Sequence, residues 1–191
     1  MNRLPCVRVL PAVALLVGIA AGAAEPEEHP LRNARVGEYV TYRITQVTGD
    51  LKSGATVKVV VVARDAAIVT LKEIATIDAT GGLPPSTSAE ERKVDLTKPY
   101  PPPFLPGGAL VKDQKVERVR SGKEKVKAGG KDYDTEWEEY RVTMKVDGSD
   151  QTMSVKVWRS KAVPLDGMVK MGLRNGSLET VMELVEAGKE K

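Results

Sequence analysis

The chain has 191 residues, with 29 basic and 26 acidic side chains, one histidine and one cysteine. The two signs of charge are interspersed, which indicates a solvated surface and argues against a nucleic-acid-binding protein. Cys6 lies close to the first residue, so disulfides and thiolate chemistry are excluded from the rest of the chain. The chain is long enough for one domain with its own hydrophobic core.

The first 23 residues have the pattern of a secretory signal. Arg3 and Arg8 come before or at the start of the apolar run "VLPAVALLVGIAA", and small residues follow at 21–23. We therefore expect residues 1–23 to be a cleaved signal peptide and the mature protein to be periplasmic or secreted. The run is shorter than the roughly 20 apolar residues that cross a bilayer, so we expect no transmembrane anchor in the mature chain.

The mature chain is predicted to form a single β domain. Residues 24–35 contain acids and two prolines without periodicity, which predicts an extended N-terminal arm. From 36 to 187 the segments have a period of two, which favours strands, and residues 188–191 form a charged tail. For "ETVMELVEAGKEK" helix is the alternative, but the preceding Asn175-Gly176 turn favours a strand.

Turn residues divide this domain into strands. "VGEYVTYRITQV", "TVKVVVVA" and "AIVTLKEIATIDA" predict a three-stranded meander. "EEYRVTMKV" and "QTMSVKVW" flank Asp147-Gly148 and predict a hairpin, as do the segments around Asn175-Gly176. Another hairpin is predicted from "QKVERVRSG" and "EKVKAGGKDYDTEW", with Gly129-Gly130 breaking or turning the second strand. The expected fold is an all-β, curved antiparallel sheet or unclosed half-barrel of about nine to ten strands.

Two segments interrupt the strand pattern. "TGGLPPSTSAE" predicts a polar, solvent-facing loop. "TKPYPPPFLPGG" predicts a stiff polyproline segment that carries Tyr100, Phe104 and Leu105. These three side chains would either plug an open end of the sheet or bind a partner's aromatic groove.

No catalytic or metal-binding pattern is present. His29 is the only histidine and lies in the expected arm, which disfavours a Ser–His hydrolase, a zinc site or a histidine base. The acids of "DYDTEWEEY" alternate along one predicted strand and indicate a solvated face. We therefore expect neither enzyme activity nor a metal or other cofactor.

The segment "VWRSKAVPLDGMVKM" resembles the closing element "VW.SKDVPLGGLVK" of exported bacterial β-proteins of the LolA/LolB lipoprotein-carrier group and their uncharacterised relatives. The matching residues are Val157, Trp158, Ser160, Lys161, Val163, Pro164, Leu165, Gly167, Val169 and Lys170. The opening "PLRNARVGEYVTYRI" also resembles the "VGdWVeYr" start of such proteins. The resemblance implies an unclosed barrel that shields an acyl chain or another apolar ligand, although the lid helices of the carriers have no counterpart here.

Two functional hypotheses follow. The first is a non-catalytic exported protein that binds a lipid or lipoprotein acyl chain in a β-sheet groove. Its candidate ligand contacts are Tyr42, Tyr100, Phe104, Leu105 and Trp158. The second is a structural or protein-interaction module of the cell envelope with a filled core. Arg159 and Lys161 are interpreted as solvent-facing guards of an exposed strand edge, with ligand-binding cations as the alternative.

Overall fold

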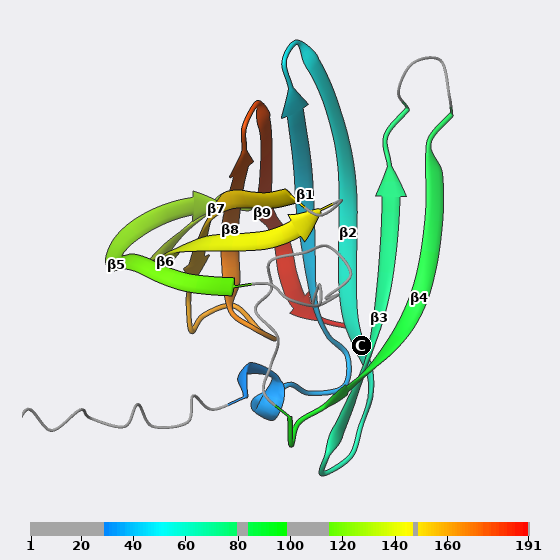
Figure 1. The fold of residues 1–191 in the computed structure, drawn as a ribbon. Coiled ribbons are helices and arrows are strands. Elements are labelled where there is room, and N and C mark those ends of the chain that lie inside the picture. Colours follow the sequence, from blue (N-terminus) through cyan, green and yellow to red (C-terminus); the bar gives the residue numbers. More distant parts are fainter. Residues whose placement is uncertain (1–28, 80–83, 99–114, 147–148, 191) are drawn as a thin grey trace, which may run out of the picture.

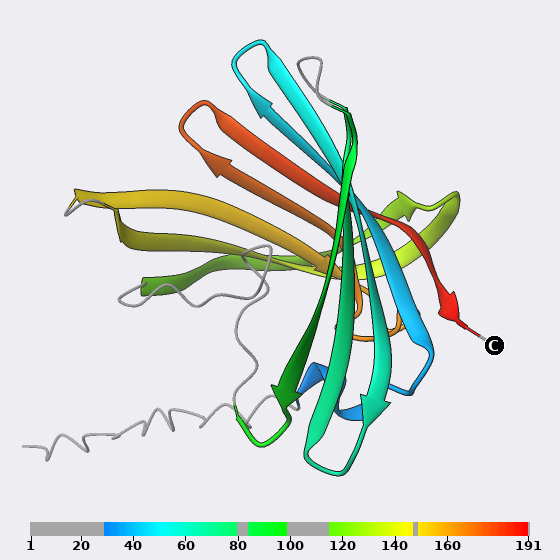
Figure 2. The ribbon, with the colours of Figure 1, turned by 90° about the vertical axis from the view of Figure 1, so that its right-hand side faces the viewer.

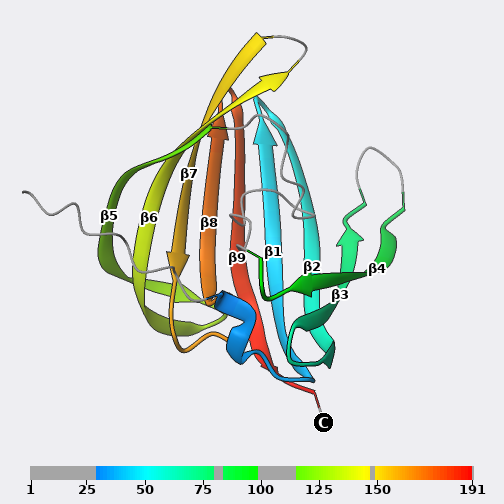
Figure 3. The same cartoon turned by 60° about the horizontal axis from the view of Figure 1, so that its bottom comes forward.

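One antiparallel sheet of nine strands forms the protein. The structure, a computed structural model, describes residues 29–79, 84–98, 115–146 and 149–190. The strand order is β4-β3-β2-β1-β9-β8-β7-β6-β5, and the sheet curves without closing into a barrel (Figures 1 and 3). The elements are η1 (Pro30–Asn33), β1 (Glu38–Thr48), β2 (Leu51–Arg64), β3 (Ile68–Ile77), β4 (Ser86–Asp95), β5 (Lys115–Ala128), β6 (Lys131–Val146), β7 (Ser149–Arg159), β8 (Met168–Asn175) and β9 (Leu178–Lys189). The predicted all-β, unclosed antiparallel fold is confirmed.

The period-two segments form strands because alternate side chains reach a common core. In the β6–β7 hairpin, Val142 lies opposite Met153 and Tyr140 lies opposite Val155. The β8–β9 hairpin also forms as predicted, and β9 is a strand to Lys189, which excludes the helical alternative and shortens the expected tail.

The third hairpin turns at Gly129-Gly130, where the sequence predicted a break or a turn, and not between the two predicted segments near Gly122. β5 continues through Gly122, and the chain turns at Gly129-Gly130, where φ is +54° and +75°. Gly122 is not a turn residue: a Cβ atom there would lie 2.8 Å from the Trp137 indole, which covers it. The glycine is needed for close packing, so its presence in the sequence is a misleading turn signal.

Two further expectations at the borders of strands were wrong. The segment predicted as a loop over 80–90 becomes β4 from Ser86, and Thr87 lies opposite Thr76 of β3. Its polar composition suits a strand at the edge of the sheet. In the described part of the expected arm, residues 30–33 form η1, a 3-10 helix whose Leu31 side chain is buried in the core.

The buried side chains form two apolar clusters. The larger cluster spans β1 and β5–β9, and the smaller one joins η1 to β2, β3 and β4. Val59 and Leu165 pack against both clusters. Every methionine after residue 1 belongs to the larger cluster: Met144, Met153, Met168, Met171 and Met182.

The sheet is coiled so strongly that the β5–β6 turn reaches β9. A Cβ atom at Gly129 would lie only 2.3 Å from the carbonyl oxygen of Val185. Figure 2 shows this hairpin bending away from the flatter β1–β4 part of the sheet. No helix in the described ranges is long and apolar enough to cross a membrane.

Candidate functional site: an amphiphilic groove

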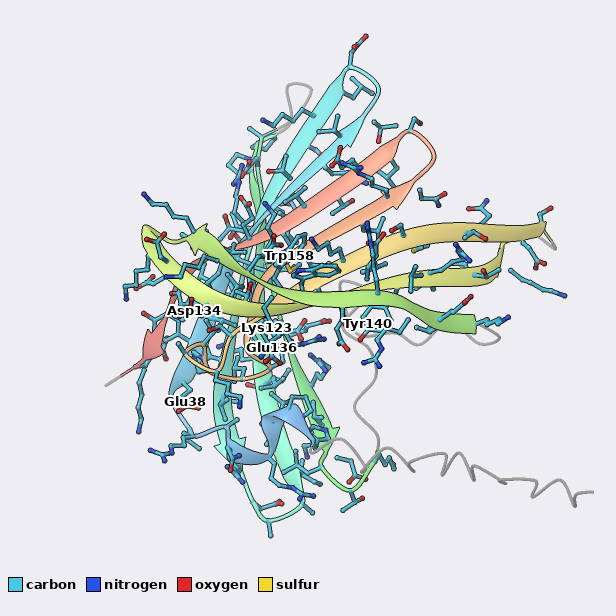
Figure 4. The ribbon with its side chains drawn as sticks, turned by 90° about the vertical axis from the view of Figure 1, so that its left-hand side faces the viewer. Glu38, Lys123, Asp134, Glu136, Tyr140 and Trp158 are labelled. Carbon is cyan, nitrogen blue, oxygen red and sulfur yellow. The ribbon has the colours of Figure 1, made fainter. Side chains whose placement is uncertain are left out.

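An open groove of about 1730 Å³ lies between the β5–β6 hairpin and the segment from Arg159 to Gly167. Residues around η1, the start of β1 and the end of β9 complete its walls. Figure 4 shows Lys123, Asp134 and Glu136 on the hairpin, with Glu38 on the β1 side. The groove is larger than the roughly 300–1,000 Å³ of ordinary small-molecule pockets, so it has room for a long or branched ligand.

The groove has an apolar floor, which we define as its buried or half-buried apolar residues Ala34, Val163, Leu165 and Ala187. Ala34 belongs to the smaller apolar cluster and Val163 to the larger one. Ala187 packs against the larger cluster, and Leu165 against both. The floor is therefore an exposed edge of the core, continuous with the methionine-containing cluster.

The segment between β7 and β8 presents Leu165 to this floor at a conformational cost. Leu165 has φ of +64°, a left-handed value at which an ordinary side chain costs about 1–2 kcal/mol. The segment is closed where the Ser160 N–H donates to the Gly167 carbonyl at 2.8 Å. A Cβ atom at Gly167 would lie 2.9 Å from the Ser160 carbonyl oxygen, and its φ is +72°, so the glycine is required there.

Charged side chains form the rim of the groove, which we define as its exposed charged residues. Lys123 pairs with Glu136 at 2.8 Å, and Asp134 lies 3.8 Å from Lys125. The hydrogen bond from Lys123 lowers the pKa of Glu136. An apolar floor beneath a charged rim is the arrangement that suits an amphiphilic ligand.

Two charged groove residues, Arg159 and Asp166, lie where the groove meets the sheet, and Arg159 contacts the Glu138 carboxylate of β6. The Arg159 guanidinium lies 3.5 Å from Glu138, which also accepts hydrogen bonds from Arg118, at 2.9 Å, and from the Tyr140 hydroxyl. Burial opposes ionisation of Glu138, but the bonds from Tyr140 and Arg118 outweigh it and lower its pKa. Burial raises the pKa of Asp166, against the Met168 N–H and the charge of Arg159.

The interpretation of Arg159 as a guard of an exposed edge is wrong. β7 lies between β6 and β8, so it has no free edge, and Arg159 is half-buried against Glu138. Lys161 is exposed, as expected, but it lines the groove.

The other face of the sheet carries a stack of aromatic and cationic side chains. Trp137 lies opposite Trp158 on neighbouring strands, and the Lys156 ammonium lies 4.0 Å and 4.3 Å from their ring centroids. Glu124 accepts the indole N–H of Trp158 and lies 3.2 Å from the Lys156 ammonium. The bond from Trp158 lowers the pKa of Glu124. These contacts join β5, β6 and β7 on this face.

Of the predicted ligand contacts, Tyr42 and Trp158 lie within the described residues, and the structure does not bring these two together. Tyr42 is buried in the larger cluster, and its hydroxyl donates to the Met168 carbonyl at 3.1 Å. Trp158 follows buried Val157 and therefore lies on the opposite face of the sheet. Neither residue lines the groove. Tyr100, Phe104 and Leu105 lie outside the described residues, so their role stays a prediction.

Sequence reasoning missed most of the groove residues because they come from five separated segments. The signals present were Gly129-Gly130 and the Pro164–Gly167 stretch, which mark the two turns that wall the groove. Among the described residues, no group of three or more histidine, cysteine or acidic side chains is arranged to hold a metal ion.

The fold and the groove define an open, strongly curved β-sheet protein with an amphiphilic groove at one end. No family model matches the chain, and no curated protein matches it. Similar solved structures include a protein from Bacteroides fragilis described as exported, with a YmcC-like fold (12% identity, TM-score 0.47, 82% of this chain and 97% of that one). A protein from Parabacteroides distasonis described as a lipoprotein has 11% identity and a TM-score of 0.48 over 81% of this chain and 96% of that one.

A third similar structure, from Vibrio parahaemolyticus, is described as an outer membrane lipoprotein-sorting protein domain (11% identity, TM-score 0.28, 81% of this chain and 85% of that one). These descriptions agree with the resemblance to exported β-proteins and the lipoprotein-carrier group that the sequence indicated. At TM-scores below 0.5 the similarities carry no argument about what this chain binds.

Proposed function

We propose that the protein is a non-catalytic, exported binding protein whose groove holds the apolar part of a lipid or of a lipoprotein acyl chain. The observation that carries the proposal is the open groove of about 1730 Å³ with its apolar floor. Half-buried Leu165 and Ala187 give an apolar chain a surface on which it can lie out of water. Each methylene group placed on the floor would contribute about 0.8 kcal/mol.

The methionine-containing cluster is continuous with the floor through Val163, and none of its methionines lines the groove. Methionine side chains are unbranched and adaptable, so the core behind the floor can adjust when a ligand moves the floor residues. The five methionines of the cluster are all buried, with exposed fractions of 8% or less.

The test is to purify the protein without detergent from its native host, extract it with organic solvent and identify bound lipid by mass spectrometry. We expect lipid in a fixed ratio to protein. Leu165→Asn should reduce that ratio, because asparagine accepts a left-handed φ but makes the floor polar. Leu51→Asn is the matched control, because Leu51 is 77% exposed and does not line the groove.

If Leu165→Asn does not fold, Ala162→Asp replaces it, because Ala162 is exposed and lines the groove. A lipid-free wild-type protein would contradict the proposal and favour the alternative, an envelope interaction module with a filled core. Equal lipid content in the groove variants and the control would place the lipid elsewhere.

A further inference from the structure

Among the described residues, three lysines at the groove have no carboxylate partner. Five cationic side chains line the groove, and two of them are paired: Lys123 with Glu136, and Arg159 with Glu138. In the part of the chain that the structure describes, the other three have no carboxylate within salt-bridge distance: Lys131, Lys161 and Lys189.

These lysines come from three walls of the groove. Lys131 follows the β5–β6 turn, Lys161 lies in the segment between β7 and β8, and Lys189 ends β9. All three are exposed, so their ammonium groups can move toward a ligand. Lys161 lies near enough to Glu136 to favour its ionised form, but Glu136 already holds Lys123 at 2.8 Å.

Most acids of the groove are already engaged by protein groups. Glu124 lies 3.2 Å from Lys156, Asp134 lies 3.8 Å from Lys125, and Glu136 pairs with Lys123. Glu38 accepts the Arg35 backbone N–H at 2.8 Å. Asp166 accepts the Met168 N–H at 3.2 Å. The charge of Arg159 acts on Asp166, whereas Glu38 and Asp132 form no ion pair among the described residues. The three lysines therefore face two such acids, and a small excess of positive charge is left for a ligand.

We propose that the ligand of the groove is an amphiphile with an anionic phosphate or carboxylate head, held at Lys131, Lys161 and Lys189 while its apolar chain lies on the floor. This inference rests on the proposed function and adds the charge of the head group. Lysine suits the binding of such a head group, because its ammonium is a point charge on a flexible stem and can reach phosphates or carboxylates of different shape.

The test compares probes that share an eight-carbon chain and differ only in the head: octyl phosphate, octyl glucoside and octyltrimethylammonium. Binding to the delipidated full chain is measured by calorimetry, below the concentrations at which the probes form micelles. At low salt we expect octyl phosphate to bind about tenfold more tightly than octyl glucoside, since each exposed contact contributes a few-fold in affinity. The advantage should shrink at high ionic strength.

The decisive variant is the triple substitution Lys131→Gln, Lys161→Gln and Lys189→Gln. It should lower the affinity for octyl phosphate to that for octyl glucoside and leave octyl glucoside binding unchanged. Its matched control is Lys52→Gln, Lys115→Gln and Lys145→Gln, which removes the same charge at three exposed lysines outside the groove. The control should retain the preference for phosphate.

The possible failures are distinguishable. Equal affinity for octyl phosphate and octyl glucoside, or a preference that survives the groove triple variant, would overturn the anionic head and leave the proposed function intact. Inorganic phosphate that binds as tightly as octyl phosphate would overturn it as well, because the floor would then contribute nothing. If none of the three amphiphiles binds, the proposed function fails together with the inference.

Discussion

Gly129 shows how a single residue permits the coil of the sheet. Its missing side chain leaves room for the Val185 carbonyl oxygen, to which a Cβ atom would approach within 2.3 Å. Gly130, the next residue, has a similarly left-handed φ but nothing within 4 Å of a Cβ atom. Substitution of Gly130 should therefore reveal the cost of the left-handed backbone alone, and substitution of Gly129 that cost together with the clash against Val185.

We predict that Gly129→Ala lowers the free energy of unfolding by about 3 kcal/mol, of which about 1 kcal/mol is conformational and the rest is overpacking. Gly130→Ala should lower it by only the conformational part, about 1 kcal/mol. Chemical denaturation at equilibrium measures both. Equal losses in the two variants would show that the β5–β6 turn does not pack on β9.

At the scale of elements, η1 is a short helix with several attachments. The Arg64 side chain of β2 donates to the Ala34 and Arg32 carbonyl oxygens, and Leu31 is 1% exposed in the smaller cluster. His29 precedes the helix, and its Nδ1 accepts the Leu31 N–H at 3.2 Å. Burial and the nearby charge of Arg32 lower the pKa of His29 from its usual 6.5.

This shift predicts how stability changes with pH. Because the folded pKa lies below the unfolded one, the contribution of His29 is fully present above pH 6.5 and is lost as the pH falls through the folded value. His29→Asn replaces the Nδ1 acceptor with a side-chain oxygen, which can also accept the Leu31 N–H but does not titrate. From pH 8 to pH 5 the wild type should therefore lose more unfolding free energy than the variant, as measured by urea denaturation at each pH. Parallel curves would contradict the prediction.

The elements that could be predicted were those whose sequence contains both alternation and an unambiguous turn. The β6–β7 and β8–β9 hairpins satisfy both conditions, because Asp147-Gly148 and Asn175-Gly176 follow regular strands. β4 could not be predicted, because an edge strand exposes polar side chains on both faces and resembles a loop. The turn of β5–β6 was ambiguous because Gly122 serves packing and Gly129 serves the turn.

At the scale of the whole molecule, Leu165 joins the two halves of the core. Its side chain packs against both clusters, whereas Val163, two residues earlier, belongs to the larger one alone. The strained φ of Leu165 shows that the surrounding structure compensates for a local cost. The segment between β7 and β8 therefore couples β2–β4 to β5–β9.

We predict that Leu165→Ala speeds hydrogen exchange of buried amides in both halves, including β3 and β8. Val163→Ala should act on β5–β9 and β1 but leave β3 unchanged, because it contacts one cluster. Native-state exchange followed by mass spectrometry gives both patterns. Faster exchange confined to one half in Leu165→Ala would show that the two clusters open independently.

The sequence allowed us to expect an apolar groove but not to say where it lies. An apolar binding surface on a curved sheet was expected from the strand pattern and the resemblance, but its position depends on the long-range contact of the β5–β6 turn with β9. Such a contact between separated segments leaves no local periodicity in the sequence. For the same reason Tyr42 and Trp158, chosen as aromatic side chains on strands, lie on opposite faces of the sheet.

The gathering of five methionines in one cluster has a chemical consequence. Peroxides convert methionine to its sulfoxide, a polar and chiral side chain that no longer packs among apolar neighbours. Because Met144, Met153, Met168, Met171 and Met182 are enclosed together, their oxidation requires the cluster to open. Oxidation of one adds a polar oxygen atom that disrupts the packing of its neighbours, so it would expose the remaining methionines to further oxidation. None of the five lines the groove, so the sulfoxide content would record how often the core opens rather than whether the groove is occupied.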